Sequence, residues 1–93
     1  MRSESHEPTA DVYRQLQGVL EEALSLGTRA YDLKPDSRLL GALPELDSQA
    51  VLSVLMSIEE RFGITIADDD VDAEVFATLR SLAKLVAHKT ADQ

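Results

Sequence analysis

The chain has 93 residues, no cysteine and no tryptophan, and seventeen acidic against nine basic residues give it a net charge of −8. This length suits one small domain, and a hydrophobic share of 44% can form a core without disulfides or cysteine-bound zinc. We expect no nucleic-acid binding, because the sequence has neither a basic stripe nor aromatic residues for base stacking. No apolar run is long enough for a membrane span and the first residues lack a signal-peptide core, so a cytoplasmic protein is expected.

The negative charge is concentrated in the middle of the chain. Residues 45–74 contain nine acids and one base, Arg61, whereas residues 1–44 carry a balance of −2 and residues 75–93 a balance of +2. A surface of one sign attracts partners of the opposite sign, although an acidic face can also serve solubility alone. The aspartate-rich run 68–72 lacks the glycine and glutamate spacing of an EF-hand, so we expect a solvated face and no metal site there.

The first expected element is a helix that begins near Val12 with Asp11 as its cap and stops at Gly27. The polar residues 1–10 before it are expected to be a disordered tail. A leucine-rich connection follows over residues 28–46, and its apolar content indicates that it is pinned onto the core. Apolar side chains share one face of the first helix, at Val12, Leu16, Val19, Leu20 and Ala23.

A central helix is expected to begin at Asp47 or Ser48, either of which can cap it, and to end at Gly63. A short helical segment within 68–74 and a last helix capped by Thr78 follow, and no strand pattern is present. The pattern therefore predicts an all-α fold with three longer helices and one short helix. The core face of the central helix is expected to contain Val51, Val54, Leu55, Ile58 and Phe62.

Residues 46–52, LDSQAVL, resemble the D-S-L attachment motif of the acyl carrier protein family. Residues 58–64, IEERFGI, are similar to the E-E-x-F ending of that family's central helix, and Phe62 follows Ser48 by fourteen residues, as in the family. The resemblance covers about residues 11–88 as the carrier domain, followed by a tail at 89–93, and implies a four-helix acyl-carrier-type bundle. The loop also resembles carrier proteins of bacterial exosortase and exopolysaccharide loci.

The resemblance implies that Ser48 carries a covalent 4′-phosphopantetheine arm from coenzyme A, with Asp47 as its motif neighbour, and that acyl groups travel on the arm as thioesters. A helix N-terminus also favours an anionic phosphodiester, although serine at this position is often only a cap. The resemblance further implies that this chain is a monomeric phosphoprotein of fatty acid or polyketide biosynthesis and not an enzyme. The implied partners are a phosphopantetheinyl transferase, an acyl-loading ligase, and an acyl-using synthase or transferase with basic docking surfaces.

Two groups of side chains on the central helix have further expected roles. Leu52 and Met56 lie on a flank that is either a partner surface or a wider core stripe, and the resemblance favours the partner surface. Pro44 and Glu45 replace the family's usual Leu-Gly, which bears on which enzymes recognise the chain. The full expected recognition set is Gln49, Leu52, Met56, Glu59 and Glu60, and an acyl chain or an ordinary core is expected beside Val54, Ile58 and Phe62.

Three alternative functions remain open from the sequence. A peptidyl or aminoacyl carrier shares the fold and differs only in the cargo that the loading ligase supplies. An interaction adaptor keeps the fold and never receives the arm. A serine hydrolase requires a histidine beside Ser48, for which His88 is the candidate.

Overall fold

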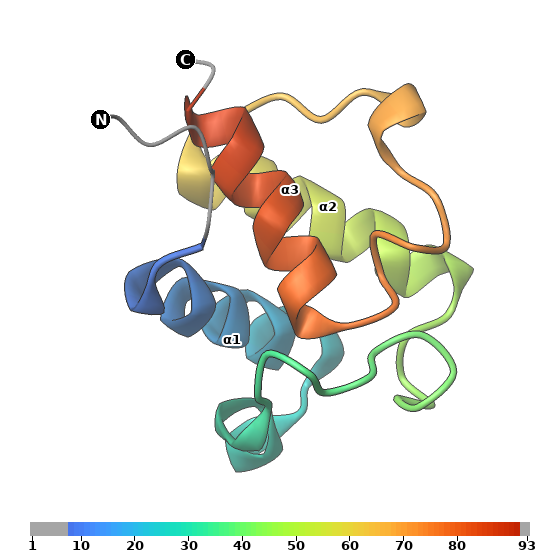
Figure 1. Cartoon of the computed structure of the whole chain (residues 1–93). Coiled ribbons are helices and arrows are strands. Elements are labelled where there is room, and N and C mark those ends of the chain that lie inside the picture. Colours follow the sequence, from blue (N-terminus) through green and yellow to red (C-terminus); the bar gives the residue numbers. More distant parts are fainter. Residues whose placement is uncertain (1–7, 92–93) are drawn as a thin grey trace.

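The computed structural model describes residues 8–91, and this part of the chain is helical, with no β-strand. One isolated β-bridge joins Arg38 and Thr78. The all-α class and the expected order of elements are confirmed (Figure 1), with the short segment formed as a single 3-10 turn. The elements are α1 (Ala10–Leu24), η1 (Gly27–Asp32), α2 (Ser48–Phe62), η2 (Asp68–Asp70) and α3 (Leu79–Ala91), where η denotes a 3-10 helix.

The core lies where the three α-helices meet, because α1 contacts both α2 and α3 and these two contact each other. Figure 1 shows α3 crossing in front of α2, with α1 below them. All buried residues in the described part are hydrophobic, so no buried side chain there needs a polar partner. The helices contribute Leu16, Val19, Leu20, Val54, Ile58, Leu79, Leu82 and Val86 to the fully buried set.

The start of α1 differs from the expected one. Thr9 is the N-cap, since its hydroxyl accepts a hydrogen bond from the N–H of Val12 at 3.3 Å, and the helix already includes Ala10. Asp11 lies in the first turn, where its carboxylate accepts from the side chain of Gln15 at 2.7 Å. The prediction that Asp11 caps this helix was wrong, because threonine and aspartate are both good caps and the chain offers both within three positions.

The end of α1 comes earlier than expected. The helix stops at Leu24, and Ser25 adopts a left-handed conformation with φ 55° while its N–H donates to the carbonyl oxygen of Glu21. Leu26, which follows this turn, is buried in the core. Gly27, with φ 64°, therefore opens η1 and does not end α1.

The connection between α1 and α2 is held against the start of α3. The N–H groups of Leu39 and Leu40 donate to the carbonyl oxygens of Ala77 at 3.0 Å and Phe76 at 2.9 Å. Leu39 is fully buried, and Leu46 is buried just before α2. The expectation that this leucine-rich segment is pinned onto the core is confirmed.

The last helix is capped as expected and continues into the segment that was expected to be a C-terminal tail. The hydroxyl of Thr78 accepts from the N–H of Ser81 at 3.1 Å, and the N–H of Thr78 donates to the hydroxyl of Ser81 at 3.0 Å. α3 continues to Ala91, past the expected domain end at residue 88, and Lys89 forms an ion pair with Asp70. Residues 1–7 of the expected N-terminal tail lie outside the described residues. None of the described helices combines the length and apolarity that a membrane crossing needs.

Candidate functional site

Ser48 is the first residue of α2, and its side chain is exposed. The residue before it, Asp47, is the N-cap: its carboxylate accepts a hydrogen bond from the N–H of Ala50 at 2.8 Å. The hydroxyl of Ser48 forms no hydrogen bond within residues 8–91. Of the two residues that the sequence offered as a cap, Asp47 takes this role and leaves the Ser48 hydroxyl available.

The surroundings of Ser48 suit a phosphodiester. The N–H groups of Ser48 and Gln49 donate to no acceptor in the described part of the chain, and they lie in the first turn of α2. The positive end of the helix dipole lies at the same place, so an anion attached to the Ser48 hydroxyl is stabilised there. These donors come from the backbone, and a 4′-phosphopantetheine phosphate therefore fits this position without a basic side chain.

An apolar strip on α2 faces outward beside this hydroxyl. The side chains of Leu52 and Met56 lie one helical turn apart and are 62% and 64% exposed. Gln49 is exposed as well. The structure thus places three of the expected recognition residues on the outer face of α2, and it shows that Leu52 and Met56 are not part of the core stripe.

The two glutamates near the end of α2 have different surroundings. Glu59 is half-buried, and its carboxylate accepts a hydrogen bond from the N–H of Ile66 at 2.8 Å, which ties the segment after α2 back to the helix. Glu60 is exposed, and its carboxylate forms no hydrogen bond or ion pair within residues 8–91. Glu60 is therefore available to a partner, whereas the Glu59 carboxylate already has a partner inside the fold.

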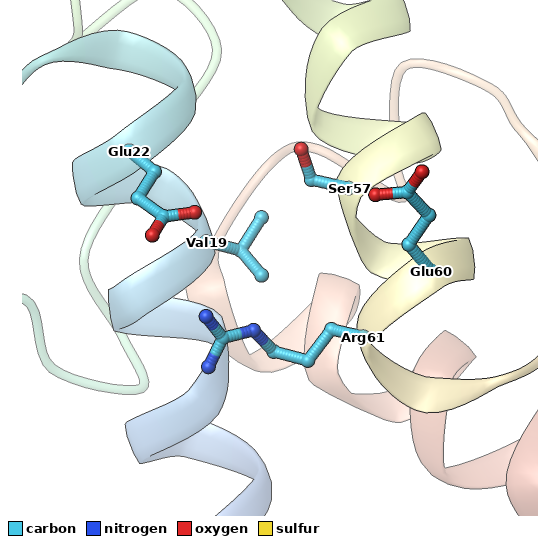
Figure 2. A pocket seen from close by; sticks show the side chains of 5 residues that line it. All are labelled: Val19, Glu22, Ser57, Glu60 and Arg61. Carbon is cyan, nitrogen blue, oxygen red and sulfur yellow. The ribbon is translucent and has the colours of Figure 1, made fainter.

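The residues expected to line an acyl-chain space are core residues. Val54 and Ile58 are fully buried, and Phe62 is half-buried and packs against the same core. A pocket of about 280 Å³ lies elsewhere, on the surface between α1 and α2 (Figure 2). It is lined by Val19, Glu22, Ser57, Glu60 and Arg61, a charged lining that does not suit a hydrocarbon chain.

This surface pocket was not singled out from the sequence. Figure 2 shows the side chain of Arg61 reaching from α2 across to α1. A Cβ atom at Gly18 would lie 3.5 Å from the guanidinium of Arg61, so the arginine packs on the bare backbone of α1. The available sequence signal was Gly18 itself. Glycine in the middle of a helix lowers helix stability, so its presence there indicates that another group approaches the backbone closely.

The other chemistries considered from the sequence find no support in the geometry. Figure 1 shows the C-terminal end of α3, which contains His88, on the opposite side of the molecule from the start of α2. A Ser48–His88 pair is therefore absent. Among the described residues, no group of three or more histidine or acidic side chains is arranged to hold a metal ion.

Comparisons with known proteins agree on one family. The family described as "Phosphopantetheine attachment site" matches residues 14–86. An acyl carrier protein of Helicobacter hepaticus is 32% identical over 76 residues, which cover 82% of this chain and 93% of that protein. A holo acyl carrier protein of Nitrosomonas europaea, solved by NMR in solution, superposes with a TM-score of 0.83 at 40% identity and covers 89% of this chain and 99% of that one.

Proposed function

The chain belongs to the acyl carrier protein family, whose members are carriers and not enzymes, and we propose that Ser48 bears its covalent 4′-phosphopantetheine arm. The observation that carries this proposal is the exposed, unbonded hydroxyl of Ser48 at the first position of α2, where Asp47 has taken over the capping role. The bound arm supplies a terminal thiol that forms thioesters with acyl groups.

The attachment step requires little of this chain. A bond forms between Ser48 Oγ and the β-phosphorus of coenzyme A, and the bond from that phosphorus to the bridging oxygen breaks. Adenosine 3′,5′-bisphosphate leaves with that oxygen, and the hydroxyl proton passes to a base of the transferase. Ser48 therefore needs exposure and position, and it needs no neighbouring base within its own chain.

The outer face of α2 is the proposed docking surface for the transferase and for acyl-loading and acyl-using enzymes. Leu52 and Met56 offer exposed apolar contact area one and two turns after Ser48. Glu60 adds negative charge, which favours a basic surface on the partner. A long arm at the start of this helix then keeps the bound acyl group at a high effective concentration beside the docked enzyme.

Intact-mass spectrometry tests the assignment. The wild-type chain is incubated with coenzyme A and a broad-specificity phosphopantetheinyl transferase, together with Ser48→Ala and Ser53→Ala variants. Ser53 is an exposed serine on the same helix and is the matched control. We expect one phosphopantetheinyl group on the wild type and on Ser53→Ala, and none on Ser48→Ala.

Two results would contradict the assignment. Modification of Ser48→Ala would move the arm to another residue. An unmodified wild type, after several transferases have been tried, would favour a helical adaptor that never receives the arm.

The loading ligase determines whether the cargo is an acyl group or an aminoacyl or peptidyl group. Incubation of the modified chain with loading ligases and their acyl or aminoacyl substrates tests this choice.

A further inference from the structure

We infer that the ion pair between Arg29 and Glu45 positions the segment that leads into Ser48, and that it thereby sets how readily the transferase accepts this chain. The inference rests on the proposed role of Ser48. Arg29 belongs to η1, and Glu45 lies three residues before Ser48. The pair therefore connects the start of α2 to a helix that is distant in the sequence.

The segment 41–47 has few other polar links. Its hydrogen bonds are local turns, such as Leu46 N–H to the Leu43 carbonyl at 3.0 Å, or bonds to the first turn of α2. Within residues 8–91, the Arg29–Glu45 pair is the one hydrogen bond or ion pair that joins this segment to a helix other than α2. The remaining attachment comes from buried Leu46 and half-buried Leu43.

Both partners of this pair are held in place. The Nε of Arg29 also donates to the carbonyl oxygen of Leu26 at 3.5 Å, which orients the guanidinium on η1. The hydrogen bond from Arg29 keeps the pKa of Glu45 below its ordinary value, so the carboxylate is charged at neutral pH. The second carboxylate oxygen, Oε1, is covered and accepts no hydrogen bond from residues 8–91. A covered oxygen without a partner costs desolvation free energy, which offsets part of what the ion pair contributes. The net stabilisation is therefore small, and the main role of the pair is to place the segment 41–47.

A displacement of Glu45 is transmitted directly to the attachment site. The N–H of Asp47 donates to the carbonyl oxygen of Glu45 at 3.2 Å, and Asp47 in turn caps α2 through Ala50. Ser48 follows the cap directly. Release of the Glu45 side chain therefore loosens the turn that orients Ser48, and even small misplacements of a reacting group slow a transfer reaction.

The ion pair between Asp36 and Arg80 provides a matched control. It also joins the long connection to a helix through exposed side chains. At that end, however, backbone hydrogen bonds hold the same two segments: the N–H of Arg80 donates to Pro35 at 2.8 Å, and the N–H of Leu79 donates to Ser37 at 3.0 Å. Loss of this side-chain pair leaves the backbone bonds in place, far from Ser48 in the sequence.

The test measures transferase kinetics and amide hydrogen exchange on the full chain. We compare Arg29→Gln, Glu45→Gln, the charge swap Arg29→Glu with Glu45→Arg, and the control Arg80→Gln. We expect the two single variants to lose about two- to fivefold in kcat/KM for phosphopantetheinylation, the range that a surface ion pair can supply. The swap is expected to recover part of this loss, and the control is expected to match the wild type.

Exchange gives a readout that is independent of the transferase. We expect the Leu46 amide to exchange faster in Arg29→Gln and Glu45→Gln than in Arg80→Gln, with similar melting temperatures. Wild-type kinetics and exchange in both single variants, or an equal loss in Arg80→Gln, would overturn the inference. If the wild type itself accepts no arm, the proposed function fails. The positioning role is judged separately by hydrogen exchange, and it fails if the Leu46 amide exchanges at the wild-type rate in Arg29→Gln and Glu45→Gln.

Discussion

The two faces of α2 carry apolar residues at the same helical spacing but have opposite exposures. Val54 and Ile58 lie four residues apart and are 0% exposed, whereas Leu52 and Met56, also four residues apart, are more than half exposed. The difference depends on what covers each face, since α1 and α3 pack on the first pair and no described element buries the second. Helical periodicity alone identifies an apolar stripe; the surrounding helices decide how wide it becomes.

The largest expected effect separates these two faces by stability. Ile58→Ala removes side-chain atoms from the closed core and should lower the free energy of unfolding by about 2–5 kcal/mol. Met56→Ala removes a mostly exposed side chain and should change it by no more than about 0.5 kcal/mol. Urea unfolding followed by circular dichroism measures both variants, and equal losses would mean that Met56 belongs to the core.

For kcat/KM of the transferase reaction, the order of the two variants should be reversed, with the larger loss in Met56→Ala and the smaller in Ile58→Ala. Met56→Ala is expected to lower kcat/KM for the transferase, because an exposed methionine supplies contact area only when a partner is bound. Tyr31→Ala, another exposed large side chain outside α2, is the control and should retain the wild-type value. A loss in Tyr31→Ala equal to that in Met56→Ala would argue that docking does not centre on α2.

The next expected effect is a difference in stability between variants of the two adjacent glutamates of α2. Glu59→Gln weakens the hydrogen bond that the Glu59 carboxylate accepts from Ile66, and it should cost about 1 kcal/mol of unfolding free energy. Glu60→Gln removes an exposed charge in an acidic region and should leave the stability unchanged or slightly higher. Chemical unfolding of both variants checks the difference, which disappears if the Glu59 bond contributes nothing in solution.

Much of this arrangement was predictable from local sequence signals. Thr78 and Gly63 mark helix ends through side-chain chemistry and a left-handed φ of 66°, and both were predicted. The N-cap of α1 was not, because Thr9 and Asp11 are equally suitable and the choice depends on packing that the sequence does not display.

The candidate site divides in the same way. Asp47-Ser48 is a local signal for a helix start, and the start of α2 at this position was predicted. Long-range partners were not predictable: the bond from Ile66 to Glu59 and the ion pair between Arg29 and Glu45 depend on how separate segments meet. The surface pocket beside Arg61 depends on the crossing of α1 and α2 and was missed for the same reason.

The smallest expected effect concerns pH and the segments on either side of α2. The buried face of α2 has no titratable group, so its contribution to stability should not change with pH. Glu45 before α2 and Asp70 after it have pKa values below their ordinary 4.5 and 3.8, chiefly because the side chains of Arg29 and Lys89 donate hydrogen bonds to them. A depressed pKa in the folded state means that the charged carboxylate binds its partner more strongly than in the unfolded chain.

The sign of this dependence follows from the depressed pKa values. The two carboxylates contribute stability that is fully present above their ordinary pKa values and is lost as the pH falls through their lower folded values. The free energy of unfolding should therefore decrease below about pH 4.5, more weakly at high salt, because both ion pairs are partly exposed to solvent.

Unfolding curves between neutral and acidic pH for the wild type, Arg29→Gln and Lys89→Gln measure this effect. Each variant should lose part of the acid-induced decrease, and Ile58→Ala, although much less stable, should retain all of it. A decrease that is identical in all four proteins would mean that other carboxylates of the acidic segment 45–74 cause it.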